Sequence, residues 1–469
     1  MFKTMDPLPA GRHRAACAAW HNNLYVLGGA SNSGSTAGPT TILKSRINAV
    51  DDGNTPWVEC ASEFPTAKIG AKAIVLDANR GGGNGVLMVI GGRGATVQAA
   101  DVNAAADIWI GKLDSDGNIP RWNHLVGVLP SNLTDVSVMR SDSHIFLVGG
   151  LDIKVIMSFK TQTTETRLKY KTQTVNFTVG QVLTGGTSGA TGTISADVDA
   201  GATGTLTLTG VVGTFQNNEA ITDALGGAAV ANGTQYSWGD FVAGEVITGG
   251  TSAATATIVS VNDAGATGTL ILKDVSGTFV NNEDLTGNLV GFAKADGTTA
   301  LYQTAQNKIW RAKLDSDGMS LGGFSQVGLL PAAISPINAV AMDRKRLVIS
   351  DTTSVYTARI EPSGEILPWV TSTAPESKVD HAMVLMQNND LVVLGGYNGA
   401  NVKPSCWSTS IEPDGGLKRW TLQSSMITEA MNCGVAVMGD RIFMIGGLDD
   451  ASNVLTSVQV CRVNPDGQF

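Results

Sequence analysis

One short pattern constrains the fold of this chain more than any other: a run of apolar residues that ends in a Gly-Gly pair. Residues 390–396 have the sequence Asp-Leu-Val-Val-Leu-Gly-Gly, and equivalent runs end at Gly29, Gly92, Gly150 and Gly447. Continuous apolar runs of this length are typical of strands that are buried on both faces, and glycine adopts a positive φ without steric penalty. The recurrence predicts a repeated supersecondary unit in which one buried strand ends in a tight turn.

The sequence around each Gly-Gly pair repeats as well. An apolar strand precedes the run, and an outer strand, a tight turn such as Asp116-Gly117, an aromatic residue and in most copies a proline follow it. Asp-Gly turns suit hairpins because their second position favours a positive φ. The unit is therefore a four-stranded antiparallel meander, with strands a, b, c and d in chain order. Four strands per repeat of this length predict the blades of a propeller.

Six such units follow one another along the chain. They span about residues 13–65, 66–130, 131–331, 332–375, 376–426 and 427–469. The fourth unit has Ser350-Asp351 in place of Gly-Gly, so we expect an altered turn there. The last unit ends before its d strand, and residues 2–9 have the aromatic-to-Leu-Pro spacing of that missing strand. We therefore predict an all-β fold, a six-bladed β-propeller closed by the N-terminal strand, which leaves no unpaired edge.

The order of apolar run, Gly-Gly, outer strand, turn, Trp and Leu-Pro resembles the Kelch repeat over roughly 320 residues of the chain. Kelch blades usually carry a Tyr after the Gly-Gly pair, which this chain has only at Tyr397, and a Tyr-Asp before the turn, where this chain has Leu113-Asp114 and Leu314-Asp315. The resemblance implies a Kelch-like propeller formed by residues 1–152 plus 301–469. It also implies that the face carrying the b–c loops binds partners.

The third unit is interrupted between its b strand, which ends at Gly150, and its c strand, which we expect from about Tyr302. The interruption, residues 153–300, carries a repeat of its own: residues 177–188 and 213–219 return 64 positions later as residues 241–252 and 277–283. A gapless repeat predicts two tandem copies of one small domain, at about residues 172–236 and 237–300. Alternating apolar and polar residues favour half-exposed strands in a small β-sandwich or barrel.

The insertion contains two sequence motifs, Gly-Glu-x-Ile-Thr-Gly-Gly-Thr-Ser and Gly-Thr-Phe-x-Asn-Asn-Glu. These motifs resemble modules that recur in structural proteins of tailed bacteriophages. The resemblance covers about 120 residues, and it is more specific because both motifs occur in tandem. It implies a virion protein.

Composition excludes several classes of function. The 56 glycines and 16% charged residues suit an all-β chain, and the net charge of −9 disfavours nucleic acid as a partner because phosphates require clustered Lys and Arg. The five scattered cysteines form no C-x-x-C pair and are interpreted as small buried side chains. No apolar run approaches the ~20 residues of a membrane span, and the N-terminus has no apolar signal segment.

No catalytic, cofactor or metal motif stands out in the sequence. His13 and His381 fall where a strands begin and could face a central pocket, although a structural role is favoured. The nearest candidates for the arginine triad of a sialidase-type propeller are Arg12, Arg14, Arg93 and Arg344, but no partner tyrosine accompanies them. The Asp-Ser-Asp-Gly turns lack the downstream Glu of a calcium loop. We expect no enzyme activity and no cofactor.

Binding is expected where loops extend from the scaffold, on the face shared by the b–c and d–a loops. The candidate partner-binding residues lie in the b–c loops: Arg93, Tyr397, Asn398, Asp449 and Asp450. The leading hypothesis is a bacteriophage virion protein of a tail fibre or tail tip, which adheres to a host receptor or glycan or joins tail parts. Attachment to other tail proteins would fall to the insertion, and a homo-oligomer is expected, with a trimer favoured.

Two alternatives remain open. The first is a glycan-active enzyme on a propeller scaffold, which converging Asp, Glu, His and Arg side chains at the axial mouth would favour. The second is an intracellular Kelch-type adaptor, which is disfavoured because no further partner domain accompanies the repeats.

Overall fold

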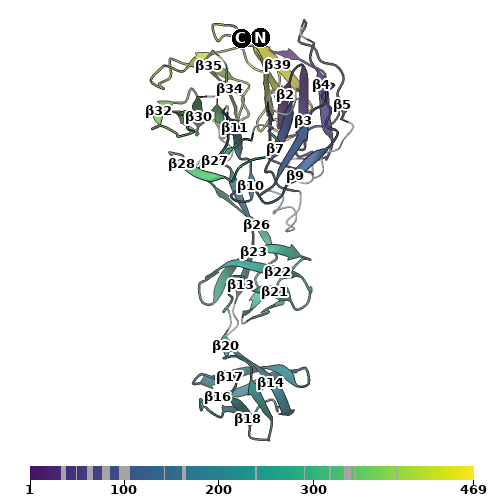
Figure 1. The fold of residues 1–469 in the computed structure, drawn as a ribbon, viewed down its shortest axis with the longest axis vertical. Coiled ribbons are helices and arrows are strands. Elements are labelled where there is room, and N and C mark those ends of the chain that lie inside the picture. The colour runs from purple at the N-terminus through teal and green to yellow at the C-terminus, as the bar shows by residue number, and fades with distance from the viewer. Residues whose placement is uncertain are drawn as a thin grey trace. The chain divides into compact units, whose positions relative to one another are not determined.

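The computed structural model describes the chain except for a set of short segments: residues 33–38, 49, 61–66, 77–84, 95–105, 142, 161–164, 238–239, 290, 316–317, 332–339, 343–344 and 387. Arg344 lies outside the described residues. Contacts divide the chain into two units (Figure 1), one that ends at Ile153 and resumes at Gln303, and one at Lys154–Tyr302. Every long regular element in the described residues is a β-strand, so the predicted all-β class is confirmed.

The first unit contains six antiparallel sheets of four strands each. The first three sheets are β2 (Ala16–Trp20), β3 (Asn23–Leu27), β4 (Ile42–Arg46) and β5 (Val58–Glu59); β6 (Lys72–Leu76), β7 (Val86–Ile90), β8 (Ile108–Lys112) and β9 (Trp122–Leu125); and β11 (Ser137–Arg140), β12 (His144–Val148), β27 (Lys308–Lys313) and β28 (Ser325–Leu329). The others are β29 (Val340–Met342), β30 (Arg346–Ser350), β31 (Ser354–Arg359) and β32 (Val370–Thr373); β33 (Ala382–Leu385), β34 (Asp390–Leu394), β35 (Cys406–Ser410) and β36 (Thr421–Leu422); and β37 (Gly434–Met438), β38 (Arg441–Ile445), β39 (Val458–Arg462) and β1 (Lys3–Thr4).

The first strands of these sheets, here called the inner strands, are successive neighbours. Contacts join β2 to β6, β6 to β11, β11 to β29, β29 to β33, β33 to β37, and β37 back to β2. The N-terminal strand β1 pairs with β39, with Lys3 opposite Val460, as the spacing of residues 2–9 predicts. Leu24 and Val26 of the first sheet share one buried cluster with Phe443 and Ile445 of the last. The first and last sheets are therefore joined by both a strand and a core.

The Gly-Gly pairs form turns, and they also connect neighbouring sheets through backbone hydrogen bonds. All five pairs have a positive φ, from 58° at Gly28 to 106° at Gly447. In four of them the second glycine donates its N–H to a carbonyl in the segment that precedes the next inner strand: Gly29 to Lys68, Gly92 to Leu133, Gly396 to Ala430 and Gly447 to Arg12, at 2.8–3.0 Å. A Cβ on the first glycine of each of these four pairs would lie 2.1–2.5 Å from that same carbonyl oxygen. Both the backbone conformation and the close approach therefore require glycine.

The fourth sheet has the altered turn that Ser350-Asp351 predicts. The Asp351 carboxylate accepts hydrogen bonds from the N–H groups of Thr353 and Ser354, which closes a short turn between β30 and β31. Ser350 Oγ lies 2.7 Å from His381 Nε2 of the next sheet. A side-chain hydrogen bond thus forms at the position where other sheets use a backbone one.

The c–d turns contact the preceding sheet. The carbonyl of Gly117 accepts a hydrogen bond from Tyr25 Oη at 2.8 Å, and that of Ser363 accepts one from Arg311 at 2.6 Å. The turn of the first sheet contacts the last, because the Asp52 carboxylate forms ion pairs with Arg441 and Arg462. The first sheet therefore contacts the last sheet in the same way as the second and fourth sheets contact the sheets before them.

The insertion contains two closed rings of six strands. The first ring runs β14 (Thr166–Val175), β17 (Thr203–Val212), β16 (Thr191–Asp199), β15 (Val182–Gly185), β18 (Ala220–Asp223), β19 (Ala228–Ala231) and back to β14, which also pairs with β20 (Tyr236–Ser237). The second runs β13 (Leu151–Lys160), β23 (Thr267–Ser276), β22 (Thr255–Asp263), β21 (Val246–Gly249), β24 (Asp284–Gly287), β25 (Phe292–Ala295) and back to β13, which also pairs with β10 (Leu133–Thr134) and β26 (Ala300–Ala305). Of the two predicted forms, sandwich and barrel, the closed rings correspond to barrels.

The two barrels are nested in the chain. Strand β13, which completes the second barrel, precedes the first barrel in sequence, and it pairs with β23 and β25. The predicted contiguous span 237–300 therefore omits one strand of the second barrel. Residues 300–305 form β26, so the c strand of the third sheet begins at Lys308 and not near Tyr302. A barrel closes only when its sixth strand covers the remaining open edge, and β13 is that strand.

The two insertion motifs occur together because one glutamate binds both. Glu219 is buried and accepts hydrogen bonds from the N–H groups of Thr187, Ser188 and Gln216 and from Ser188 Oγ. Glu283 does the same 64 positions later. The Glu of Asn-Asn-Glu thus closes the turn of Gly-Gly-Thr-Ser in each barrel.

These glutamates make the barrels sensitive to acid. Burial alone would raise the pKa of Glu219, but the hydrogen bonds from Ser188, Gln216 and Thr187 outweigh it and lower the pKa below its ordinary value. The pKa of Glu283 is lowered in the same way. A group whose pKa is lower in the folded state stabilises that state above its unfolded pKa, and the contribution is lost as the pH falls through the folded pKa.

We therefore expect the thermal stability of the barrels to fall as the pH drops below about 4. The measurement is the unfolding temperature across pH 3–7 for the wild type and for Glu219→Gln/Glu283→Gln. The double variant should be less stable at pH 7 and should vary less with pH below about 4.5. Equal slopes for both proteins would contradict the assignment.

Candidate functional site

The predicted b–c loop residues are held by hydrogen bonds within and between loops. Asp450 accepts hydrogen bonds from the N–H of Val402 at 2.6 Å and from Asn401 Nδ2 at 3.1 Å, so it joins the loops of the last and fifth sheets. Asn398 Oδ1 accepts the N–H of Asn401, and Asp449 accepts both donors of Asn453. The structure therefore brings Asn398 and Asp449–Asp450 into neighbouring loops.

Arg93 and Tyr397 do not lie at the tips of their loops, but at the ends of the loops close to the inner strands. Each pairs with the residue directly after a buried lysine: Arg93 with Ile69, which follows Lys68, and Tyr397 with Val379, which follows Lys378. Arg93 is 9% exposed. Partner binding by the five predicted residues stays a prediction.

The residues that follow Ile69 and Val379 belong to a ring that the sequence analysis missed. Five residues occupy equivalent positions just before an inner strand and share a left-handed backbone with φ of 52–70°: Arg14, Gly70, Asp135, Asp380 and Asn432. We call them the ring positions. Their backbones are linked in a chain, since the N–H groups of Asn432, Arg14, Gly70 and Asp135 donate to the carbonyls of Asp380, Asn432, Arg14 and Gly70 respectively, at 2.8–3.1 Å.

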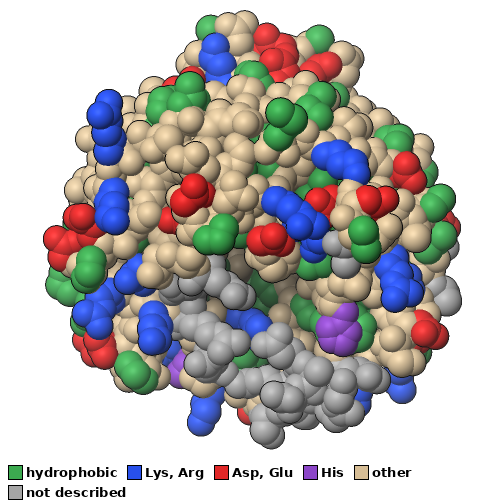
Figure 2. Space-filling model, turned by 90° about the horizontal axis from the view of Figure 1, so that it is seen from above, with side chains coloured by type: hydrophobic (Ala, Val, Ile, Leu, Met, Phe, Trp, Pro, Cys, Tyr) green, Lys and Arg blue, Asp and Glu red, His purple; other side chains and the backbone are tan. Residues whose placement is uncertain are grey.

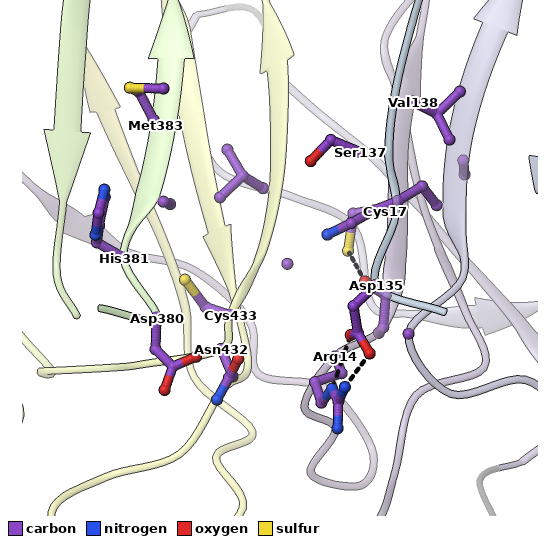
Figure 3. Close-up of a pocket in the computed structure, with 17 residues that line it drawn as sticks. Arg14, Cys17, Asp135, Ser137, Val138, Asp380, His381, Met383, Asn432 and Cys433 are labelled. Carbon is purple, nitrogen blue, oxygen red and sulfur yellow. Dashed lines mark hydrogen bonds and ion pairs between the residues drawn. The ribbon is translucent and has the colours of Figure 1, made fainter. Parts of the chain in front are cut away.

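This backbone conformation favours Gly, Asn and Asp, so Arg14 is the exception. Its guanidinium binds the Asp135 carboxylate through two donors, and Nε to Oδ1 measures 2.8 Å (Figure 3). Burial would lower the pKa of Arg14, but Asp135 more than compensates and the pKa is raised. Residues that their surroundings hold in a strained backbone conformation cluster at binding and active sites.

Asp380 carries a half-buried carboxyl group whose pKa is shifted. Burial raises its pKa to about 6, against the opposing effects of Arg14 and of a hydrogen bond from Asn432. In Figure 3 Asp380 and Asn432 lie side by side, across the cavity from Arg14 and Asp135. The ring thus holds one satisfied ion pair and one carboxyl that changes charge near neutral pH.

A cavity of about 250 Å³ opens within the ring positions. Lys72, Ser137, His381, Cys17 and Cys433 contribute polar side chains or thiols to its wall. His381 is therefore among the residues that line the central cavity, although its Nε2 lies 2.7 Å from Ser350 Oγ, whereas His13 Nε2 binds the carbonyl of Asn32. Burial lowers the pKa of His381 to about 4.

The ring was detectable in the sequence only in part. Arg14 appears among the candidates for an arginine triad, but Asp135, Asp380 and Asn432 do not. The available signal was a Gly, Asp or Asn two residues before the inner strand in most units, at Gly70, Asp135, Asp380 and Asn432. That alignment becomes visible once the strand starts are known.

No protein-family model and no curated protein matches the chain. Among solved structures, the chain is similar to one titled "Structure of YjhT", with a TM-score of 0.48 and 9% identity over 97% of this chain and 96% of that chain. In the described residues, no helix is long and apolar enough to cross a membrane. Figure 2 shows Lys and Arg interspersed with Asp and Glu over one face of the protein.

Proposed function

We propose that the six sheets form a closed six-bladed propeller of the Kelch type, with the two barrels inserted into its third blade. The cyclic contacts of the inner strands, the pairing of β1 with β39 and the contact of the Asp52 turn with Arg441 and Arg462 support the closure. Closure in a propeller leaves only short, protected edges.

For its function, the chain is a structural protein of a tailed-bacteriophage virion, in a tail fibre or tail tip. The observation that carries this is the glutamate-closed Gly-Gly-Thr-Ser turn, built with the same hydrogen bonds in both barrels. It makes the motifs that resemble phage structural modules into one structural unit, used twice. The b–c loop face would bind a host receptor, a glycan or another tail part, and the insertion would attach the chain to tail proteins, as a homo-oligomer with threefold symmetry favoured.

Mass spectrometry of purified particles tests this proposal. The chain should copurify with tail proteins through a density gradient, in a fixed ratio to them, while an abundant cytoplasmic protein of the producing cell is depleted. Particles that lack the chain would refute the virion assignment.

A second function is favoured by one observation: Arg14, Asp135 and Asp380 converge at one cavity. A carboxyl whose pKa lies near 6 can act as an acid or a base near neutral pH, as glycan hydrolysis or elimination requires. The protein would then cleave an oligosaccharide, and Asp380→Asn would abolish cleavage. Glycan binding by the full chain without turnover would count against this alternative.

A further inference from the structure

Lys72 is a cation of the ring cavity that forms no ion pair with the described residues. It is the first residue of β6, lines the cavity and is exposed to solvent. Among the described residues no hydrogen bond or ion pair to its ammonium is formed, in contrast to Arg14, which Asp135 neutralises. An ammonium within a cavity interacts more strongly with an anion than one in open solvent does.

The surroundings of Lys72 make room for a ligand. The equivalent positions on other described inner strands hold small residues: Ala16, Ser137, Ala382 and Gly434. Lys72 is therefore the one long side chain at this level of the described strands. The cavity of about 250 Å³ is somewhat below the size of pockets for drug-like ligands, which suits a small molecule.

The nearby thiols do not supply the missing negative charge. Cys17 and Cys433 are the groups on which the Lys72 charge acts, and burial raises the pKa of each to about 12, so both stay neutral. In the cavity wall, Arg14, Asp135, Asp380 and Asn432 carry planar groups of donors and acceptors, which suit hydroxyl groups.

We propose that the ring cavity binds a small monoanionic carboxylate that carries hydroxyl groups, with the carboxylate on Lys72 and the hydroxyl groups toward Asp380 and Asn432. A phosphate dianion fits less well because Asp135 and Asp380 line the same cavity and would repel its second charge. The carboxylate chemistry is shared by acidic sugars and by hydroxy acids. The inference stands apart from the proposed virion role, because it concerns the cavity alone.

Binding is expected to depend on pH through Asp380. The titratable and charged groups around the cavity are Arg14, Cys17, Lys72, Asp135, Asp380, His381 and Cys433, with Lys378 acting on His381. The thiols and His381 keep one charge state between pH 5 and 8, whereas the pKa of Asp380 is about 6. Protonation of Asp380 removes a negative charge that opposes the ligand, so affinity falls as the pH rises through this value.

Calorimetric titration of the full chain tests the site. D-glucuronate and L-lactate are the probes for the two sources, and D-glucose and inorganic phosphate are the controls. We expect saturable binding of at least one carboxylate, weaker by at least roughly tenfold in Lys72→Met and retained in Lys72→Arg. The matched control Lys112→Met, at an exposed lysine of the same sheet, should bind like the wild type. Unchanged affinity in Lys72→Met, no saturable carboxylate binding, or tighter binding of phosphate would overturn the proposal.

A second arm examines Asp380. Wild-type affinity should weaken by roughly tenfold or more from pH 5.5 to 7.5, while Asp380→Asn should bind with little dependence on pH. A flat wild-type profile would overturn the placement of the ligand beside Asp380.

Discussion

Replacing Glu245 with glutamine will destabilise the second barrel by about 2–4 kcal/mol. Glu245 is fully buried, and its carboxylate accepts hydrogen bonds from the N–H groups of Val242, Leu289 and Gly291 at 2.8–3.1 Å. A glutamine offers one acceptor oxygen and turns its amide donors toward these N–H groups. At least one N–H group would then face an amide donor in place of an acceptor, and such a loss beside a fully buried side chain costs more than the loss of an exposed hydrogen bond.

In the first barrel, a carboxylate at a different position binds the corresponding N–H groups. There the N–H groups of Thr178, Leu225 and Gly227 are bound by Asp223, at 2.8–2.9 Å. These three donors lie 64 positions before those of the second barrel. The counterpart of Asp223 is Gly287 and the counterpart of Glu245 is Gln181, so each barrel has one carboxylate from one of two places.

This exchange predicts a rescue. Gly287→Asp alone should destabilise the barrel, because a Cβ at Gly287 would lie 1.9 Å from Glu245 Oε1 and a second carboxylate would enter the site. Glu245→Gln/Gly287→Asp copies the first barrel and should recover most of the lost stability. The coupling between the two changes should reach roughly 2 kcal/mol.

Urea unfolding of the full chain, followed by hydrogen exchange at residues of the second barrel, measures these stabilities. Glu365→Gln is the matched control, because this glutamate is exposed and the same change there should cost under about 0.5 kcal/mol. Additive losses in the double variant would show that the two positions do not share one set of donors.

The repeat that made this comparison available was visible in the sequence, but the sixth strand of the barrel was not. Strand β13 alternates buried and half-buried residues along its whole length, as does the first half of β14, yet the two strands share no motif. Their role is specified by alternation alone, which many sequences satisfy. Turns with a fixed carboxylate and glycines tolerate few sequences, so they are recognisable as repeats.

The ring positions illustrate a second limit. They are separated by up to several hundred residues, and each contributes a single residue near a strand start that sequence places only within a few residues. By contrast, the Gly-Gly pairs are predictable because two adjacent residues must both be glycine. The sequence therefore suggested a central pocket through His13 and His381, and it placed Arg93 and Tyr397, which pair beside Gly70 and Asp380, but it did not identify the ring positions that line the cavity.

Gly446→Ala should disrupt the joint between the last and first sheets, with a loss of roughly 3–5 kcal/mol or failure to fold. A Cβ at Gly446 would lie 2.1 Å from the carbonyl oxygen of Arg12, the same oxygen that accepts the N–H of Gly447 at 2.9 Å. That oxygen is part of a backbone and cannot move aside without separating the two sheets. The contact of β37 with β2 would open with it.

Gly439→Ala provides the matched control for this change. Gly439 lies in the same sheet with a φ of 61°, against 63° at Gly446, but no atom lies within 4 Å of its added Cβ. The backbone cost of the left-handed region is therefore equal in both variants, about 1–2 kcal/mol, and their difference isolates the steric contact between sheets. Thermal unfolding and limited proteolysis of residues 1–20 measure it: Gly446→Ala should expose the N-terminal strand and Gly439→Ala should not. Equal stability of the two variants would mean that the first and last sheets do not meet at Arg12. This result would contradict the proposed closure of the six sheets into a propeller.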